Sequence, residues 1–267
     1  MRKSKKKVVT TAVAAASIGE IKNETVQENV GFWASPPKSK KERKIKFQTL
    51  LKRLQENVSL KEKQLEYSKK IEEHQITFVT GAAGSSKTWT ACYTLLKLLF
   101  EGKIDKIIFT KPVKESGENL GFLPGNVEDK LLPYMESFIY TCRQMIGDEM
   151  VKYLIENDFI ENRPLAYMRG ITFNNCGLFL DEAQNCLYEQ FILYITRLGE
   201  NSKIVIAGDV TQRDIEKKKV VMPDFIEMIG DLPGVCVHKF EKTDIVRNSL
   251  LIKITERYEE WKDKNNK

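Results

Sequence analysis

One segment limits the folds open to this chain more than any other: an apolar run, a loop of small residues, and then a lysine and a threonine. The run Ile76–Thr80 has the composition of a short buried strand, and the six residues that follow are all glycine, alanine or serine. A helical pattern then begins and continues to Phe100. This order is typical of a phosphate-binding loop, in which backbone N–H groups wrap a phosphate at the positive end of a helix.

Two side chains at the end of the loop have the chemistry that a nucleoside triphosphate needs. Lys87 would reach the β- and γ-phosphate oxygens, and the Thr88 hydroxyl would ligate Mg²⁺. Ser86 stands where the pattern G-x-x-x-x-G-K-S/T has its second glycine, and a Cβ there would weaken nucleotide binding. The alternative to a nucleotide-binding loop is a simple turn of small residues. The predicted nucleotide-binding residues of the loop are Gly81, Ala82, Ala83, Gly84, Ser85, Ser86, Lys87 and Thr88.

Acidic residues follow a second apolar run, Leu178–Leu180. Asp181 would hold magnesium, and Glu182 would polarise an attacking water molecule. An Asp-Glu pair after a strand is more often structural than catalytic, but the spacing of roughly a hundred residues from the loop favours a catalytic role.

A third run, Ile204–Ala207, leads to Asp209 and Gln212. Asp209 is predicted to lie at the nucleotide, and the Gln212 amide would contact the γ-phosphate or the attacking water. Ligands of open parallel sheets bind at the carboxyl edge of the strands, so we expect the three strand ends to meet in one crevice.

Strands and helices alternate along most of the chain, which predicts an α/β fold with a parallel sheet covered by helices on both faces. Two helices precede the first strand, one with apolar residues from Phe47 to Leu54 and one capped by Ser59. The expected strands are 76–80, 104–110, 178–180, 204–207 and 235–238. The expected later helices are 89–100, 128–146, 149–157, 187–198, 225–229 and 244–261.

Several segments together carry a resemblance to a known family. They are Phe78–Thr88, Lys111–Val113, Gly117–Gly125, Pro164–Gly170, Leu180–Asn185, Thr196–Gly199 and Gly208–Gln212. In this order, over about residues 50 to 258, they resemble the PhoH family of phosphate-starvation-associated P-loop ATPases, and Ser86 and the lysine-rich N-terminus are most similar to phage-encoded members. The resemblance implies a RecA-like core akin to superfamily 1 helicases, ATP hydrolysis with Mg²⁺, an association with RNA, and ring-shaped oligomers such as hexamers.

The resemblance also implies roles for three further residues. Gln64 resembles the glutamine with which helicase-like cores read adenine, and an ordinary exposed helix glutamine is the alternative. An arginine, often from a neighbouring subunit, usually offsets charge on the γ-phosphoryl group. Arg247 is the first candidate and Arg197 the second, with surface salt bridges as the alternative; Arg169 and Arg213 rank lower.

Charge is unevenly distributed. Residues 1–70 hold 18 Lys and Arg against 7 Asp and Glu, whereas the rest of the chain has a net charge of −5. Such a basic arm suggests a polyanionic partner, and single-stranded RNA is the partner that the resemblance favours; a merely solubilising tail is the alternative. Further candidates for nucleic-acid contacts are Lys111, Lys114, Arg169, Phe122 and Tyr167.

Composition narrows the class of protein. With 42% apolar and 30% charged residues and no run of about 18 apolar residues, the chain has neither a membrane-spanning helix nor the composition of a disordered protein. Met1–Ile18 superficially matches a secretory signal, but its alanines and threonines argue against one. Five dispersed cysteines indicate thiols in a reducing compartment, hence the cytoplasm, or the host cytoplasm for a phage protein.

We therefore expect a basic flexible extension over residues 1–45 and an ATPase domain over residues 46–267. The leading hypothesis is a magnesium-dependent ATPase that remodels or unwinds RNA as a homo-oligomer. The alternative is a nucleotide-gated RNA-binding or assembly protein with negligible turnover, which the altered loop position Ser86 would explain. A small-molecule kinase fits the loop but not Gly208–Gln212.

Overall fold

The computed structural model describes residues 39–112, 127–209 and 221–246, and beyond them 250, 253, 254, 257, 258 and 261; of residues 127–135 and 242 only the backbone is described. The chain divides into two units, one of Gly19–Ile245 and one of Met1–Ile18 with Val246–Lys267. All the elements described below lie in the unit Gly19–Ile245. The predicted extension lies almost wholly outside the described residues, so the division at residue 45 stays a prediction.

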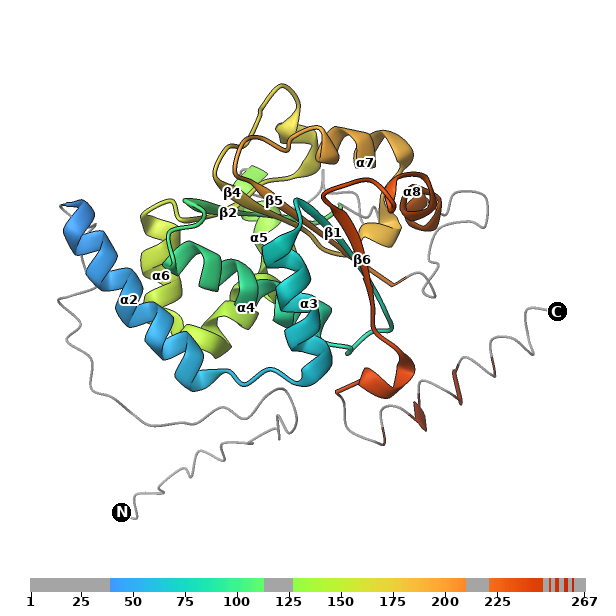
Figure 1. Cartoon of the computed structure of the whole chain (residues 1–267), viewed down its shortest axis with the longest axis horizontal. Helices are drawn as coiled ribbons and strands as arrows, with labels where there is room; N and C mark the ends of the chain where they lie inside the picture. Colours follow the sequence, from blue (N-terminus) through green and yellow to red (C-terminus); the bar gives the residue numbers. More distant parts are fainter. Residues whose placement is uncertain are drawn as a thin grey trace, which may run out of the picture. The chain divides into compact units, whose positions relative to one another are not determined.

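Six parallel strands form one sheet in the order β3-β2-β4-β5-β1-β6 (Figure 1). Every residue of β1 and β4 is buried, as expected for strands covered on both faces. The prediction of a parallel sheet covered by helices on both faces is therefore confirmed. The strands are β1 (Ile76–Thr80), β2 (Lys106–Thr110), β3 (Ile160–Asn162), β4 (Cys176–Leu180), β5 (Lys203–Gly208) and β6 (Val235–Lys239).

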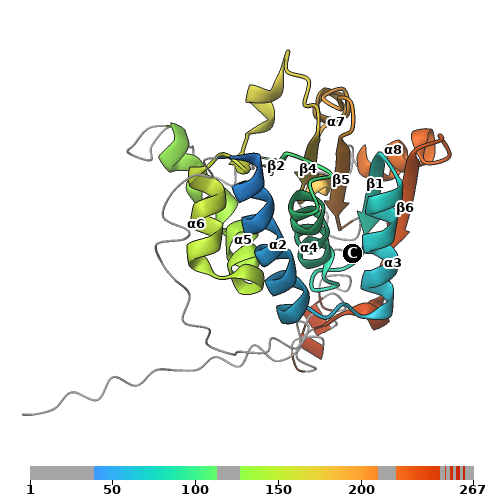
Figure 2. The same ribbon diagram turned by 60° about the vertical axis from the view of Figure 1, so that its left-hand side comes forward.

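Helices cover the two faces of the sheet unequally (Figures 1 and 2). One face packs against α2 (Lys40–Asn57), α3 (Glu62–Glu73), α4 (Lys87–Phe100), α5 (Val127–Ile146) and α6 (Asp148–Glu156). The other face packs against the 3-10 turn η2 (Leu165–Met168), α7 (Tyr188–Ile195) and α8 (Val221–Ile229). Two short 3-10 turns, η3 (Ala183–Asn185) and η4 (Lys242–Asp244), follow β4 and β6.

Alternate residues of each strand supply the two cores. In β1, Val79 belongs to the core under α2–α6 and Phe78 to the core under α7 and α8. In β2, Phe109 belongs to the core under α2–α6 and Ile108 to the core under α7 and α8. This division follows from the two-residue period of a strand. Since α4 packs against α2, α3 and α5, the helix that follows the small-residue loop lies at the centre of its layer (Figure 2).

Side-chain caps explain where the first two helices begin. α2 begins at Lys40, earlier than its apolar pattern indicates, because Ser39 Oγ accepts a hydrogen bond of 3.2 Å from the backbone N–H of Glu42. The cap of α3 is Lys61 and not the predicted Ser59, because Gln64 Oε1 accepts from the Lys61 N–H at 2.8 Å. The three-residue strand β3 was not predicted, since so short a run has no readable period.

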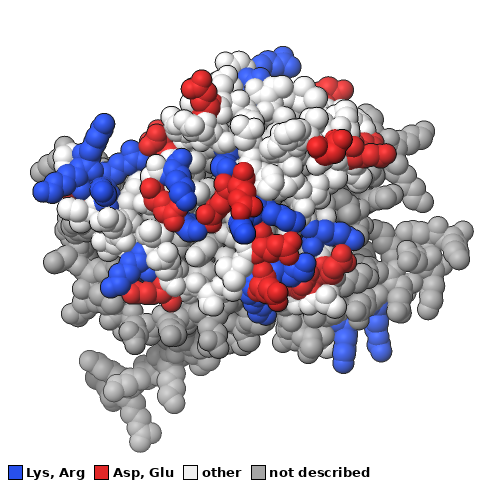
Figure 3. Space-filling model, in the orientation of Figure 1, with Lys and Arg blue, Asp and Glu red and all other residues white. Residues whose placement is uncertain are grey.

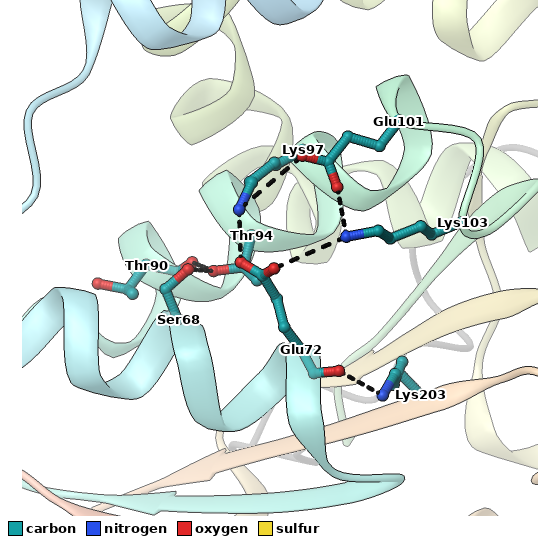
Figure 4. A network of polar contacts seen from close by, with 8 residues as sticks. All are labelled: Ser68, Glu72, Thr90, Thr94, Lys97, Glu101, Lys103 and Lys203. Atoms are coloured by element: carbon teal, nitrogen blue, oxygen red, sulfur yellow. Dashed lines mark hydrogen bonds and ion pairs between the residues drawn. The ribbon is translucent and has the colours of Figure 1, made fainter.

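A polar network connects α3 to α4 (Figure 4). The Glu72 carboxylate lies 2.7 Å from Lys97 Nζ and 3.9 Å from Lys103 Nζ. Thr94 Oγ1 lies 2.9 Å from Ser68 Oγ, so the two helices also contact each other through hydroxyls. Ion pairs of this exposure add little stability, but they fix the two helices relative to one another. The position of α3 is thereby tied to that of the loop before α4.

Candidate nucleotide-binding site

The three strand ends predicted to meet lie at one edge of the sheet. Strands β4, β5 and β1 are direct neighbours and parallel, and Thr80 pairs in register with Gly208. The segments that leave these strands are therefore adjacent, as at the carboxyl edge of other open α/β sheets. The order of the strands confirms that the three strand ends share one edge of the sheet, and a crevice at that edge stays a prediction.

The small-residue loop closes on itself and packs against Phe240, the residue that follows β6. Ser85 is fully buried, and its Oγ donates a 2.8 Å hydrogen bond to the carbonyl of Ala82. Gly81 lies against Phe240: an added Cβ would be 2.8 Å from Phe240 Cβ, a distance that real Cβ atoms do not show. Phe240 is itself held by its N–H, which donates to the Thr80 carbonyl at 2.9 Å. Glycine is thus required at position 81 by close packing.

Ser86 adopts a backbone conformation that glycine adopts more easily. Its φ of 66° and ψ of 23° lie in the left-handed region, and it is the N-cap of α4. A residue with a Cβ pays roughly 1–2 kcal/mol for this conformation. The loop therefore has the glycine-type turn that the sequence pattern calls for, with a serine in it. The departure from the pattern therefore places a side chain on a residue whose backbone conformation favours glycine.

Lys87 reaches back over the loop. Its Nζ donates to the carbonyls of Gly81 at 2.6 Å and Ala82 at 3.0 Å. The ammonium group therefore lies at the mouth of the loop, where it would meet the phosphates of a nucleotide. The first turn of α4 also directs its backbone N–H groups toward this place.

Thr88 and Asp181 are in direct contact. The Thr88 hydroxyl donates to Asp181 Oδ2 at 3.1 Å, and the backbone N–H of Asp181 donates to the Thr110 carbonyl at 3.0 Å. Burial raises the pKa of the Asp181 carboxyl, and the neighbouring Glu182 adds to this rise, whereas Lys111 and the hydrogen bonds from the Glu182 N–H and Thr88 oppose it. A cation bound at this place would stabilise the ionised form of the Asp181 carboxyl and so offset the cost of burying its charge.

The contact between Thr88 and Asp181 fits a magnesium ion. Mg²⁺ in nucleotide sites takes one or two protein oxygens and completes its shell with phosphate and water. Among the described residues no three His, Cys, Asp or Glu side chains form a metal-holding group, so a cation here would rely on such outside ligands. The donor set thus suits a nucleotide-bound Mg²⁺ better than a resident structural metal.

Glu182 lies beside this pair in a strained turn. Its φ of 55° is left-handed, and its N–H donates to Asp181 Oδ1 at 3.1 Å. The carboxylate accepts a 2.6 Å hydrogen bond from Gln184 Nε2. Gln184 Oε1 in turn accepts from the N–H of Asp209 at 3.0 Å, and Asp209 is buried. Sequence reasoning assigned no role to Gln184, because only the tertiary structure brings β5 alongside it.

Gln64 is buried and does not match the exposed-helix alternative. It is 3% exposed, and its side chain caps α3. One turn later, Tyr67 is fully buried, with its ring 5.1 Å from that of His238 and 5.7 Å from that of Phe240. Phe240 also packs against Gly81, so α3 is connected to the loop through this aromatic cluster. Contact between Gln64 and adenine stays a prediction.

The arginine candidates are not brought to the loop by any described contact. The Arg197 guanidinium donates to the carbonyls of Leu193 in α7 at 3.0 Å and of Ile171 after η2 at 2.9 Å, which are structural contacts. Arg169 is exposed. Arg247 and Gln212 lie outside the described residues, as do Arg213, Lys114 and Phe122.

Basic and acidic side chains alternate over the helical face that includes α3 (Figure 3). On α3, Glu66 pairs with Lys63 and with Lys70, each at 3.2 Å, and Lys69 pairs with Glu73 at 3.7 Å. The basic residues of this helix are therefore largely matched by acidic ones. A polyanion-binding role of the basic N-terminal quarter, residues 1–70, stays a prediction.

The parallel sheet, the loop after β1 and the acidic residues after β4 define an α/β fold of the P-loop NTPase class. The particular family follows from sequence comparison: the profile described as PhoH-like protein matches residues 58–259. The chain belongs to this family, which is a P-loop ATPase family, so the predicted resemblance to the family is confirmed, while the similarity to phage-encoded members stays a prediction.

Relatives in several bacteria match most of the chain. It is 39% identical over 197 residues to the PhoH-like protein of Bacillus subtilis, covering 73% of this chain and 62% of that protein. It is 38% identical over 192 residues to Protein PhoH of Escherichia coli K12, covering 71% and 54%. The PhoH-like protein of Mycobacterium tuberculosis H37Rv is 35% identical over 201 residues, with 75% and 57% covered. The matches span only about three-fifths of these relatives.

Two further observations concern membrane-spanning helices and the cysteines. Within the described parts of the chain, no helix has the length and apolarity to cross a membrane. All five cysteines are described, none forms a disulfide, and four of them are buried. Burial raises the pKa of Cys186 to about 12 and that of Cys176 to about 11, so these thiols stay protonated at neutral pH.

Proposed function

We propose that this protein hydrolyses ATP with the help of Mg²⁺. The observation that carries the proposal is the contact between Thr88 and Asp181 beside the Lys87 ammonium group. The three side chains supply two oxygen ligands for a cation and one positive charge for the phosphates. This combination is what the transfer of a γ-phosphoryl group to water requires.

Each predicted residue has a role in this proposal. The loop from Gly81 to Ser86 wraps the β-phosphate with its N–H groups, and Lys87 contacts the β- and γ-phosphate oxygens. Thr88 and Asp181 hold Mg²⁺, which when bound offsets phosphate charge. Glu182 orients and polarises the attacking water. Asp209 and Gln212 would contact the nucleotide or that water, and Gln64 would read the adenine.

We further propose that hydrolysis is coupled to the binding, remodelling or unwinding of single-stranded RNA by a cytoplasmic homo-oligomer, with a hexameric ring as the expected form. Family membership and the basic N-terminal quarter support this part of the proposal. In an oligomer, Arg247 or Arg197 would be supplied across a subunit boundary to offset charge on the γ-phosphoryl group.

The test is phosphate release from ATP in the presence of Mg²⁺, measured for the wild type, Lys87→Ala and Lys152→Ala. Lys152 is an exposed lysine of α6 paired only with Glu156 among the described residues, so its variant controls for loss of a lysine. We expect Lys87→Ala to lose at least about 100-fold in turnover, because it removes charge stabilisation in the transition state. Equal rates for all three would refute the proposal. Repeating the assay with single-stranded RNA, alongside solution mass, tests the coupling and the oligomer.

A second function is favoured by one specific observation, the left-handed serine at position 86. In this second function the strained loop would bind ATP, but the rate of hydrolysis would be negligible. The protein would then be a nucleotide-gated RNA-binding or assembly protein. Slow wild-type turnover that Ser86→Gly restores would favour this function. A robust wild-type rate that Ser86→Gly leaves unchanged would count against it.

A further inference from the structure

The side chain of Gln184 connects the turn after β4 to the segment after β5. Its Nε2 donates to Glu182 Oε2 at 2.6 Å, and its Oε1 accepts from the backbone N–H of Asp209 at 3.0 Å. A carboxylate can only accept and a backbone N–H can only donate, so these two partners determine which end of the amide points where. Among uncharged side chains of this length, only a glutamine supplies a donor and an acceptor in this arrangement.

The surrounding backbone is built to hold the amide in place. Ala183, at the start of η3, is fully buried, and the N–H of Asn185 donates to the Glu182 carbonyl at 3.0 Å, which closes the turn around Gln184. A Cβ at Gly208 would lie 2.5 Å from Met222 Sδ, 3.1 Å from Gln184 Oε1 and 3.2 Å from Gln184 N, so it would crowd the amide as well as the methionine. The glycine at the end of β5 thus leaves room for the amide to approach.

We propose that Gln184 is a positioning residue: it orients the Glu182 carboxylate for the attacking water and makes that orientation depend on the position of the backbone at Asp209. This inference rests on the proposed ATP hydrolysis. A glutamate side chain rotates about three bonds, and a second contact on its carboxylate removes much of that freedom before the reaction. Because the contact passes through the amide to β5, movement of the β5 segment would change the catalytic geometry at β4.

A purely structural role for Gln184 makes a different prediction. If the amide only holds two segments together, its loss lowers stability and acts on every function of the site, whatever residue stands at 182. If it acts through Glu182, its loss matters for turnover only while the Glu182 carboxylate is present. A double-mutant cycle separates these cases, because residues that act as a unit have non-additive effects.

The experiment compares the wild type, Gln184→Met, Glu182→Gln and the double variant in phosphate release, together with the affinity for a fluorescent ATP analogue. Methionine has nearly the shape of glutamine but lacks both hydrogen-bonding groups. We expect Gln184→Met to lower kcat by about 10- to 100-fold, as for other residues that orient a catalytic group, with KM and analogue affinity within about twofold. In the Glu182→Gln background the same substitution is expected to change kcat by less than about twofold.

Gln190→Met is the matched control. Gln190 also accepts a hydrogen bond from a backbone N–H, that of Leu187 at 2.8 Å, but it is half-buried on α7 and outside the site. We expect this variant to keep the wild-type kcat. If Gln184→Met does not fold, Gln184→Leu replaces it, because leucine also lacks both hydrogen-bonding groups and adds no charge beside Glu182, and its cycle is read in the same way.

The outcomes distinguish this inference from the proposed function. Additive effects of the two substitutions, or a fall in analogue affinity as large as the fall in kcat, would overturn the role of Gln184 while leaving ATP hydrolysis standing. Wild-type phosphate release no faster than that of Lys87→Ala would overturn the proposed function, and the positioning role with it. Non-additive losses confined to kcat would establish the positioning role.

Discussion

Thr88 Oγ1 donates a hydrogen bond of 3.1 Å to Asp181 Oδ2 and so joins the first turn of α4 to the end of β4, 93 positions along the chain. This contact brings a hydroxyl oxygen and a carboxylate oxygen together at the start of the helix that follows the loop, where we propose that they hold Mg²⁺.

Thr88→Val keeps the shape of the side chain but removes the hydroxyl. We expect magnesium-dependent turnover to fall by about 100-fold or more, since one cation ligand is lost, with a higher magnesium concentration needed for half-maximal rate. The rate is measured as a function of Mg²⁺ at saturating ATP. Thr49→Val on α2, whose hydroxyl donates only to the Ile45 carbonyl among described groups, is the control and is expected to keep the wild-type rate. An unchanged magnesium dependence in Thr88→Val would contradict the ligand role.

Asp181→Asn tests the buried carboxylate. Burial raises the pKa of Asp181, so the folded chain holds this proton more tightly than the unfolded chain, and the ionised group lowers the stability of the metal-free protein at neutral pH. We therefore expect Asp181→Asn to unfold at a higher temperature than the wild type without metal. Adding Mg²⁺ with ADP is expected to stabilise the wild type but not the variant.

Thermal unfolding with and without Mg²⁺ and ADP measures both effects. Asp158→Asn is the control, because Asp158 makes a surface ion pair with Lys106 and has a left-handed φ that asparagine tolerates. Stabilisation of wild type and Asp181→Asn by equal amounts would show that Asp181 does not hold the cation.

Position 86 can be tested by a graded series. Ser86→Gly removes the Cβ from a left-handed residue, and we expect stability to rise by up to about 1 kcal/mol once the greater freedom of glycine in the unfolded chain is counted. Ser86→Val adds a branched side chain that this conformation excludes, and we expect it to destabilise the chain and to lower nucleotide affinity. Urea unfolding and binding of an ATP analogue report the two effects. Equal stability of Ser86→Val and Ser86→Gly would show that the turn differs from the one described.

Gly81→Ala tests the packing of the loop on Phe240. The new Cβ would lie 2.8 Å from Phe240 Cβ and 3.1 Å from the Phe240 carbonyl oxygen, so the loop has to shift. We expect a loss of about 1–3 kcal/mol in stability and about a tenfold loss in nucleotide affinity. Gly102→Ala is the control: its φ is +71°, but nothing lies within 4 Å of an added Cβ, so only the conformational cost applies. A smaller loss at Gly81 than at Gly102 would argue against close packing.

His238 makes stability depend on pH. Burial, helped by Lys70, lowers the pKa of its imidazole from 6.5 to about 4, while Glu66, 3.7 Å away, partly opposes the shift. Between these two pH values the unfolded chain binds the proton and the folded chain does not. Stability therefore falls as the pH drops from about 6.5 to about 4, by at most about 3 kcal/mol.

His238→Phe keeps a ring stacked on Tyr67 but cannot be protonated. We expect the difference in urea midpoint between pH 7 and pH 5 to be smaller in this variant than in the wild type. The phenylalanine ring is larger than imidazole, but its packing cost is the same at both pH values and therefore cancels in that difference. Identical pH dependence in both chains would show that other groups account for the acid sensitivity.

The sequence predicted the strand, loop and helix around Lys87 because these elements depend on residues close together in the chain. It also predicted that Asp181 and Asp209 would share an edge with the loop, since parallel strands end on the same side of a sheet. The exact caps were less accessible: Ser59 has a capping side chain, yet Gln64 caps α3 from within the helix. Several residues near the start of a helix can cap it, and tertiary packing decides which of them does so.

What the sequence determined by itself is the class of fold and the chemistry of the strand ends, because hydrophobic period and residue type act over a few neighbouring positions. Only the tertiary structure decided that Thr88 touches Asp181, that Phe240 closes in on Gly81, and that Gln184 joins Glu182 to the β5 segment. Each of these contacts crosses between strands that are far apart in the chain. Their existence depends on the order β4-β5-β1-β6 in the sheet, which is set by how the whole core packs and not by any local pattern.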